Sequence, residues 1–296
     1  MSIPLVERSG WCLKARSLTP CLTVSSLGMN GCHIFISINQ EKKILQSQTQ
    51  FSAPHLKQPL WKSRTEANHL FKTKLDPKLK YPLPENVKSH TIEVKRSARW
   101  FHIGESPKNS NEIIVILHGY GQHPSYMLNS LKSLEAPGRC ICAPEGLSKF
   151  YIRGTNGRVG ASWMTRDNRQ QEITDQIAYL TFWLKSLEIP ETTPVTLIGF
   201  SQGVATAARW IAHGAEIDTL IFASGQLPPE WVTSPPKLSE RLKEIHIICP
   251  KNDEYYTQDA FKVDVNLLIP FGLDLNLHEP EGNHTLSADL LNEILN

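Results

Sequence analysis

The stretch "VTLIGFSQGVATAARW", from Val195 to Trp210, places one serine between two glycines, after an apolar run and before an alanine-rich run. The apolar run predicts a buried strand and the alanine-rich run predicts a helix. A chain that turns from a strand directly into a helix forces its apex residue into an unfavourable conformation, and neighbours with a Cβ atom would clash. Gly199 and Gly203 remove that clash, so we expect Ser201 to be held exposed above the carboxyl end of its strand.

Strands alternate with helices around this stretch, from about residue 90 to residue 296. Further strands are predicted at "EIIVILHG" (112–119), "RCICAPEG" (139–146), "DTLIFASG" (218–225), "EIHIICP" (244–250) and "LDLNLHEP" (273–280). Helices are predicted over 123–134, 170–187, 202–214 and 287–295, and residues 149–169 are expected to be irregular. Two alternating segments, "HTIEVKR" (90–96) and "ARWFHI" (98–103), indicate antiparallel strands. The fold class predicted is α/β, with a mostly parallel central sheet, helices on both faces and an antiparallel N-terminal edge.

Composition and charge divide the chain in two. The 296 residues are 40% hydrophobic and 20% charged, which is ordinary for a globular protein. Residues 1–87 contain 12 basic and 5 acidic residues, whereas residues 88–296 contain 19 basic and 24 acidic residues. We interpret residues 1–87 as a basic, mostly disordered extension and residues 88–296 as a single folded domain.

The first 40 residues carry one acid, three bases and several serines. This pattern fits a weak organellar transit peptide, and it fits equally well a leader absent from the working protein, with Met29 or a later site as the start. A cytoplasmic location is expected, with an organelle as the alternative. No apolar run reaches the roughly 18 residues that a membrane span needs, so no integral membrane segment is predicted.

Six cysteines are present and none forms a CxxC pair. Cys140 and Cys142 alternate with Arg139 and Ile141, so both should face the same side of one strand. We interpret the cysteines as small buried hydrophobic residues of a reducing compartment, with a metal site or a disulfide framework as alternatives.

A serine hydroxyl is a poor nucleophile at neutral pH unless a base lies within hydrogen-bond reach and an acid orients that base. In a hydrolase sheet built of alternating strands and helices, these partners follow the serine in the order acid, then histidine, in loops after later strands. Asp253 follows the strand 244–250, and His284 precedes the last helix. Glu254 and Asp259 are the alternative acids, although Asp259 is expected to lie in the next helix.

An acyl-transfer intermediate carries an oxyanion that needs preorganised donors. The backbone N–H of Gln202, directly after the serine, should provide one donor. The backbone N–H of Tyr120 should provide the second, because Gly119 and Gly121 let that loop approach the site. We expect His118 to brace this loop rather than to take part in the chemistry.

The motifs "LHGYGQ", "GASWM" and "LIGFSQG", the Asp253 loop and "GNH" together resemble one known family. It is the phospholipase/carboxylesterase branch of the α/β-hydrolases, which includes the acyl-protein thioesterases. The resemblance covers roughly residues 90–296. It implies an α/β-hydrolase fold, with Ser201 as nucleophile, His284 as base and Asp253 as its partner.

The same resemblance implies main-chain oxyanion donors at Tyr120 and Gln202. It also places Trp163, with Gly119 and Gly121, at the substrate pocket, and packing in the core or a lid is the alternative role of Trp163. The chain departs from the family pattern in "CPKNDEYY", which has no His-Gly pair before the acid, and at Gln122, where an acidic residue is common.

The segment 149–169 also departs from the family, because it carries four arginines and does not resemble the apolar channel of the thioesterase members. In this respect the chain is more similar to bacterial esterase-like members of the same branch. The arginines form either a solvated loop face or a site that recognises a carboxylate or phosphate group on the substrate. They are Arg153, Arg158, Arg166 and Arg169.

The function predicted is hydrolysis of a small-molecule carboxylic ester or thioester through an acyl-serine intermediate, without a metal or organic cofactor. Two alternatives are a non-catalytic ligand-binding protein built on a hydrolase fold and a serine peptidase. Binding of nucleic acid is not predicted, because the basic residues are dispersed and no stacking motif accompanies them. The sequence does not indicate an oligomeric state.

Overall fold

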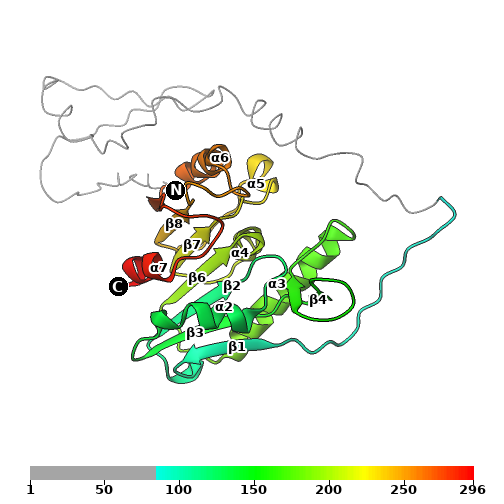
Figure 1. Cartoon of the computed structure of the whole chain (residues 1–296), viewed down its shortest axis with the longest axis horizontal. Coiled ribbons are helices and arrows are strands. Elements are labelled where there is room, and N and C mark those ends of the chain that lie inside the picture. Colours follow the sequence, from blue (N-terminus) through cyan, green and yellow to red (C-terminus); the bar gives the residue numbers. More distant parts are fainter. Residues whose placement is uncertain (1–84) are drawn as a thin grey trace, which may run out of the picture. The chain divides into compact units, whose positions relative to one another are not determined.

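The structure, a computed structural model, describes residues 85–296, and the extension predicted for residues 1–87 lies outside this range except for its last three residues. A seven-stranded sheet has the order β1-β3-β2-β6-β7-β8-β9 (Figure 1). Only the edge strand β1 is antiparallel to its neighbour. The predicted mostly parallel sheet with an antiparallel N-terminal edge is therefore confirmed. Its strands are β1 (Trp100–Gly104), β2 (Glu112–Leu117), β3 (Arg139–Pro144), β6 (Val195–Phe200), β7 (Thr219–Ala223), β8 (Glu244–Ile248) and β9 (Asp274–His278).

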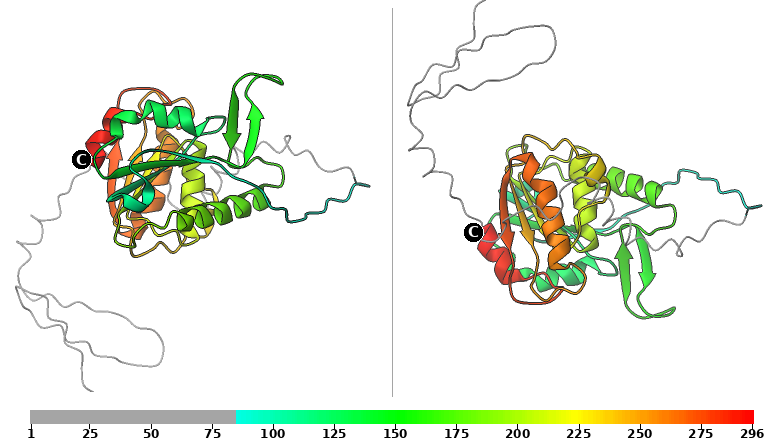
Figure 2. Two further views of the ribbon diagram at one scale, coloured as in Figure 1. Left: turned by 90° about the horizontal axis from the view of Figure 1, so that it is seen from below. Right: turned by 90° about the horizontal axis from the view of Figure 1, so that it is seen from above.

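Helices cover both faces of this sheet (Figure 2). One face carries α3 (Arg169–Ser186), α4 (Gln202–Ala212), α5 (Glu230–Thr233) and α6 (Gln258–Leu268), and the other carries α2 (Pro124–Ser130) and α7 (Ala288–Leu295). Short 3-10 turns occur at Pro107–Asn109, Lys132–Leu134 and Ile269–Phe271. The helices begin where the sequence provides caps: the Thr257 and Ser287 side chains accept from the backbone N–H of Ala260 and Leu290, respectively.

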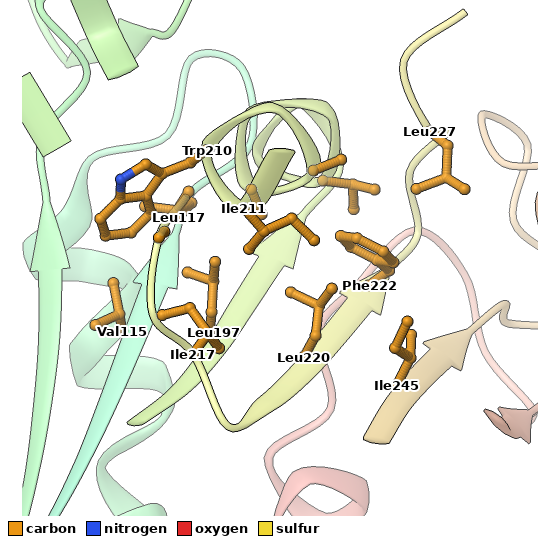
Figure 3. Close-up of a cluster of buried hydrophobic side chains, with 14 of the residues drawn as sticks. Val115, Leu117, Leu197, Trp210, Ile211, Ile217, Leu220, Phe222, Leu227 and Ile245 are labelled. Atoms are coloured by element: carbon orange, nitrogen blue, oxygen red, sulfur yellow. The ribbon is translucent and has the colours of Figure 1, made fainter. Parts of the chain in front are cut away.

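The main core lies between α4 and the sheet (Figure 3). The fully buried Trp210 of α4 packs in a cluster with residues of the neighbouring strands, among them Leu197 and Phe222. Burying each such side chain contributes about 1.5–3 kcal/mol to the free energy of folding. Because β6 is buried on both faces, its position in the centre of the sheet is fixed, and so is the turn that follows it.

Two sequence predictions were wrong. Residues 90–96 form no strand, and Ile92 and Val94 are exposed, because the alternating pattern has no partner face to pack against. Residues 149–169 are not wholly irregular: β4 (Ser148–Tyr151) and β5 (Val159–Ser162) pair as an antiparallel hairpin that stands apart from the central sheet (Figure 2). These strands are too short and too polar to give a clear period in the sequence.

The three cysteines of the described residues, Cys140, Cys142 and Cys249, are buried as free thiols. Cys140 and Cys142 lie on the same side of β3, as predicted, with their Sγ atoms 3.4 Å apart. In the part of the chain from residue 85 onward, no helix is both long enough and apolar enough to cross a bilayer.

Candidate active site

Ser201 occupies the turn between β6 and α4 in a strained conformation, with φ 53° and ψ −116°. Few residues other than glycine adopt a positive φ, and such strain is concentrated at functional sites. A Cβ at Gly199 would lie 2.8 Å from the Gly203 carbonyl oxygen, and a Cβ at Gly203 would lie 2.1 Å from the Leu117 carbonyl oxygen. Both glycines are therefore required for space, as the sequence predicts. A third glycine, Gly225, plays the same part, because its Cβ would lie 2.2 Å from the Ser201 carbonyl oxygen.

The imidazole of His284 lies against the Ser201 hydroxyl, with Nε2 2.9 Å from Oγ. His284 comes from the loop between β9 and α7, 83 residues along the chain from Ser201. Its ring lies next to two aromatic rings, with centroids 5.1 Å from Phe200 and 4.8 Å from Tyr255. The side chain of His284 keeps 21% of its surface exposed, so the ring remains open to solvent on one side.

Asp253 lies on the other side of the imidazole, with its carboxylate oxygens 2.9 and 3.0 Å from His284 Nδ1. The loop after β8 holds this carboxylate, because the backbone N–H groups of Tyr255 and Tyr256 both donate to Oδ1 at 2.8 Å. Tyr256 is fixed in turn by its hydroxyl, which donates to Asp264 at 2.9 Å. The structure therefore brings Asp253 to the histidine. The alternatives Glu254 and Asp259 are exposed, and Asp259 lies in α6.

Electrostatics keep Asp253 ionised. Burial acts to raise the pKa of this carboxyl, but the hydrogen bonds from the Tyr256 N–H, from His284 and from the Tyr255 N–H outweigh it and lower the pKa below its ordinary value. An ionised carboxylate accepts a hydrogen bond from Nδ1–H, which leaves the lone pair of Nε2 directed at the Ser201 hydroxyl. This is the tautomer that a general base requires.

The loop after β2 lies directly against the serine. A Cβ at Gly119 would be 3.1 Å from the Ser201 Cβ, and Gly121 has a positive φ of 71°. Within this loop the N–H of Gly121 donates to Ala161, whereas no hydrogen bond within residues 85–296 uses the N–H of Tyr120. The N–H of Gln202 has no acceptor in that range either, because it is the first residue of α4. The two backbone N–H groups that the sequence indicates as donors are therefore unused within the described residues.

Two glutamine side chains fix the geometry of the site, and sequence reasoning did not find these contacts. The Gln122 Oε1 accepts from the Gly119 N–H at 2.7 Å. The Gln202 Oε1 accepts from the Trp163 N–H at 3.0 Å, and its Nε2 donates to the Met164 carbonyl at 2.8 Å. In the sequence, Gln122 stands where the family commonly has an acidic residue, and this departure was the available signal. The hydrogen bond from the Gly119 N–H shows that the neutral glutamine side chain can also close this loop.

Trp163 is fully buried, with 1% of its surface exposed. Its indole N–H donates to the His118 carbonyl at 2.8 Å, and the two rings stack with centroids 4.8 Å apart. This is the core-packing arrangement that the sequence analysis left open. His118 accepts from the Gly146 N–H through Nε2 at 3.0 Å, so its Nδ1 carries the proton that it donates to the Gly119 carbonyl at 2.8 Å. Its contacts brace the loop, as expected.

His118 makes stability depend on pH. Burial lowers the pKa of its imidazole to about 4, against an ordinary value of 6.5. As pH falls from 6.5 to 4, the unfolded chain takes up a proton that the folded chain does not, so the free energy of unfolding falls by up to about 3 kcal/mol. We expect His118→Gln to have a shallower dependence on pH in urea unfolding over this range. The same change at the exposed His90 should leave the dependence as in the wild type, and an equal slope for His118→Gln would contradict the prediction.

Two exposed tyrosine rings belong to the loops that carry the site residues. Tyr255 is 76% exposed beside His284, and Tyr120 is 60% exposed. The Tyr120 ring lies 5.1 Å from the ring of Phe150 in β4, so the hairpin contacts the loop after β2. Tyr255 was not predicted from the sequence, although its position two residues after Asp253 was the available signal.

The arginines of residues 149–169 divide into two groups. Arg153 and Arg158 belong to the exposed tip of the β4–β5 hairpin, where the Arg158 guanidinium lies 5.5 Å from the centroid of the Tyr126 ring. Arg166 is exposed in the segment before α3, and Arg169 is the first, partly buried residue of that helix. The segment is therefore not a single solvated face.

Comparison with known proteins supports the fold. No family model matches the sequence, and neither does any curated protein. Esterase PE8 is 20% identical with a TM-score of 0.54, over 68% of this chain and 98% of its own. The acyl-protein thioesterase 2 of Zea mays is 17% identical with a TM-score of 0.53, over 67% of this chain and 96% of its own. A phospholipase/carboxylesterase from Dyadobacter fermentans is 21% identical with a TM-score of 0.52, over 69% of this chain and 99% of its own.

These similarities, together with the sheet order and the helices on both faces, define an α/β-hydrolase fold. At such low identities the comparisons support the fold alone. What this particular chain does must be inferred from the geometry at Ser201.

Proposed function

We propose that the chain is a serine hydrolase that cleaves small-molecule carboxylic esters or thioesters through an acyl-serine intermediate. One observation carries the proposal: Ser201, His284 and Asp253 form a continuous hydrogen-bonded series, with 2.9 Å from Oγ to Nε2 and 2.9 Å from Nδ1 to Oδ2. The solved structures of similar fold include proteins described as esterases and thioesterases, which supports the same class of reaction.

In the first half of the reaction, His284 Nε2 removes the Ser201 proton as Oγ attacks the carbonyl carbon of the substrate. The carbonyl oxygen becomes an oxyanion, which the backbone N–H groups of Tyr120 and Gln202 stabilise, typically by about 3 kcal/mol each. The imidazolium then gives its proton to the leaving alcohol or thiol as the carbon–oxygen or carbon–sulfur bond breaks. Asp253 stabilises the imidazolium throughout and stays ionised.

The second half repeats these steps with water. His284 takes a proton from a water molecule that attacks the acyl-serine, and the second oxyanion forms in the same position. When this second tetrahedral intermediate collapses, the imidazolium returns the proton to Ser201 Oγ and the carboxylic acid is released. These steps need only the three side chains and the two backbone donors, so no cofactor is part of the proposal.

Covalent labelling tests the proposal directly. A fluorophosphonate probe should label the wild-type chain once, on the peptide that contains Ser201, and it should abolish hydrolysis of p-nitrophenyl esters of both short and long acyl chains. Equal labelling of wild type and Ser201→Ala would refute the role of this serine. Labelling without turnover of any ester or thioester would favour a non-catalytic ligand-binding protein, and turnover of peptide amides alone would favour a peptidase.

A further inference from the structure

A buried carboxyl group that takes no part in the proposed reaction lies next to the acid loop, residues 249–257 between β8 and α6. Asp264 of α6 is 2% exposed, and Tyr256, which contacts it, is 1% exposed. The Tyr256 hydroxyl donates to Asp264 Oδ2 at 2.9 Å, and the backbone N–H of Leu227 donates to the same oxygen at 3.1 Å. Asp264 therefore joins two loops that are far apart in the sequence.

Stability alone does not explain a carboxyl group at this place. Burial raises the pKa of Asp264 to about 7, against the opposing effect of the hydrogen bonds from Tyr256 and from the Leu227 N–H. Holding the group here therefore costs free energy. A buried hydrogen-bonded pair can often be replaced by apolar groups of the same shape without loss of stability. The positions of the two donors indicate a role at the active site instead.

The first donor belongs to a residue that holds the carboxylate of the site. The backbone N–H of Tyr256 donates to Asp253 Oδ1 at 2.8 Å, and the side chain of Asp253 is fully buried. Tyr256 thus donates to Asp253 through its main chain and to Asp264 through its side chain. Because the ring is buried, a fixed hydroxyl limits the movement of the backbone N–H at the other end of the residue.

The second donor belongs to the loop after β7, which packs against the nucleophile. Gly225 of this loop lies so close to Ser201 that a Cβ would be 2.2 Å from the Ser201 carbonyl oxygen. Leu227 lies two residues further along the same loop and is 3% exposed. Asp264 thus connects the loop beside Ser201 to the loop that carries Asp253.

We propose that Asp264 and Tyr256 are positioning residues of the active site. By tying the acid loop to the loop after β7, they fix the Asp253 carboxylate against the imidazole of His284. This inference rests on the proposed function and deepens it, because it assigns a part in the reaction to two residues that do not touch the reacting atoms. Small displacements of a catalytic group lower rates strongly, so the effect should appear in kcat.

Tyr256→Phe tests the proposal on the full chain, because it removes only the hydroxyl. We expect kcat for a short-chain p-nitrophenyl ester to fall about tenfold, the effect of one lost hydrogen bond to a charged group, with KM unchanged. Tyr179→Phe removes a hydroxyl that donates to the Arg99 carbonyl at 3.2 Å, and it should keep both constants. A Tyr256→Phe protein that is less stable but keeps the wild-type kcat would overturn the proposal.

A double substitution separates positioning from general damage. If the hydroxyl acts through Asp253, Tyr256→Phe should lower kcat no further in a chain that already carries Asp253→Asn. Damage that does not pass through Asp253 would instead add to the loss. A further fall of about tenfold in the double variant would therefore refute the positioning role.

Two substitutions of Asp264 test the carboxyl group itself. Asp264→Asn keeps an acceptor for both donors, whereas Asp264→Leu removes it at similar size. We expect the asparagine variant to have a kcat at least about tenfold above that of the leucine variant. Equal kcat in the two folded proteins would overturn the role of Asp264. If Asp264→Leu does not fold, the single and double variants of Tyr256 decide the proposal.

A measurement without turnover distinguishes this proposal from the proposed function. The Nδ1 proton of His284, hydrogen-bonded to Asp253, should give a resolved NMR resonance far downfield. In Tyr256→Phe we expect this resonance to broaden through exchange with water, and in Tyr179→Phe we expect it to stay as in the wild type. An unchanged resonance in Tyr256→Phe would refute the positioning role. If the wild type neither hydrolyses esters nor becomes labelled, the proposed function fails, and this resonance alone decides whether Tyr256 positions Asp253.

Discussion

Replacing Ser201 by alanine is expected to lower kcat for ester hydrolysis by about 10⁶-fold, because nucleophile and base act as a unit in such sites. The change removes the atom that lies 2.9 Å from His284 Nε2, and no other hydroxyl within the described residues is hydrogen-bonded to that nitrogen. The donors at Tyr120 and Gln202 remain, so a residual rate above that in water should persist. Steady-state hydrolysis of a short-chain p-nitrophenyl ester measures the loss.

The fold should survive this substitution. Alanine has the same Cβ as serine, so the strained φ of 53° is kept, and the hydrogen bond from the residue-201 N–H to the Ala223 carbonyl is kept as well. Circular dichroism and urea unfolding should therefore match the wild type within about 1 kcal/mol. Ser186→Ala, at the far end of α3, serves as the matched control and should retain full activity. A folded Ser201→Ala protein that hydrolyses esters at the wild-type rate would exclude this serine as the nucleophile.

The turn at Ser201 could be predicted from the sequence because its determinants are local. The apolar strand, the two glycines and the alanine-rich helix all lie within the sixteen residues from Val195 to Trp210. The third glycine of the same turn, Gly225, could not be found in this way. Its contact with the Ser201 carbonyl exists only because β7 pairs with β6, which is a fact of the sheet and not of the local sequence.

The positions of Asp253 and His284 could be predicted by a different route. Each follows a strand, and the carboxyl ends of parallel strands meet at one edge of a sheet, so residues far apart in sequence could be expected to meet there. The sequence favoured Asp253 and left the adjacent Glu254 as an alternative, because no local pattern shows how the loop holds either carboxylate. The choice depends on the two N–H donors of Tyr255 and Tyr256, which form because the loop turns back on itself after β8.

The errors also have physical reasons. The run 90–96 alternates as a strand should, but alternation produces a strand only where a neighbouring face covers the apolar side chains. The hairpin of residues 148–162 shows the opposite case. Its strands carry little pattern of their own, and the backbone hydrogen bonds of Gly121 and Gln122 with Ala161 join the hairpin to the loop after β2. In both segments the structure depends on pairing with other parts of the chain: residues 90–96 have no strand partner within the described residues, whereas the hairpin is joined to the loop after β2.

Asp253→Asn is expected to reduce kcat by about 10⁴-fold while leaving the fold intact, because it reverses the tautomer of the base. The N–H groups of Tyr255 and Tyr256 both donate to Oδ1, so the carbonyl oxygen of the new asparagine must occupy that position. Its NH2 group then replaces Oδ2, which lies 2.9 Å from His284 Nδ1. A donor at that place requires Nδ1 to accept, so the proton moves to Nε2, which can no longer take the proton of Ser201.

The adjacent acids provide the controls that the sequence itself suggests. Glu254→Gln and Asp259→Asn remove equal charge from the same segment, yet both side chains are exposed and neither is hydrogen-bonded to His284. Both variants should keep kcat within about twofold of the wild type, because neither side chain contacts the base. Their stability should also stay close to that of the wild type, as is usual for surface substitutions. A large loss of kcat in Glu254→Gln with a near-normal Asp253→Asn would assign the acid to the other residue. Equal, small effects in all three variants would show instead that orientation of His284 does not depend on a carboxylate, since only Asp253 contacts its Nδ1 in the described structure.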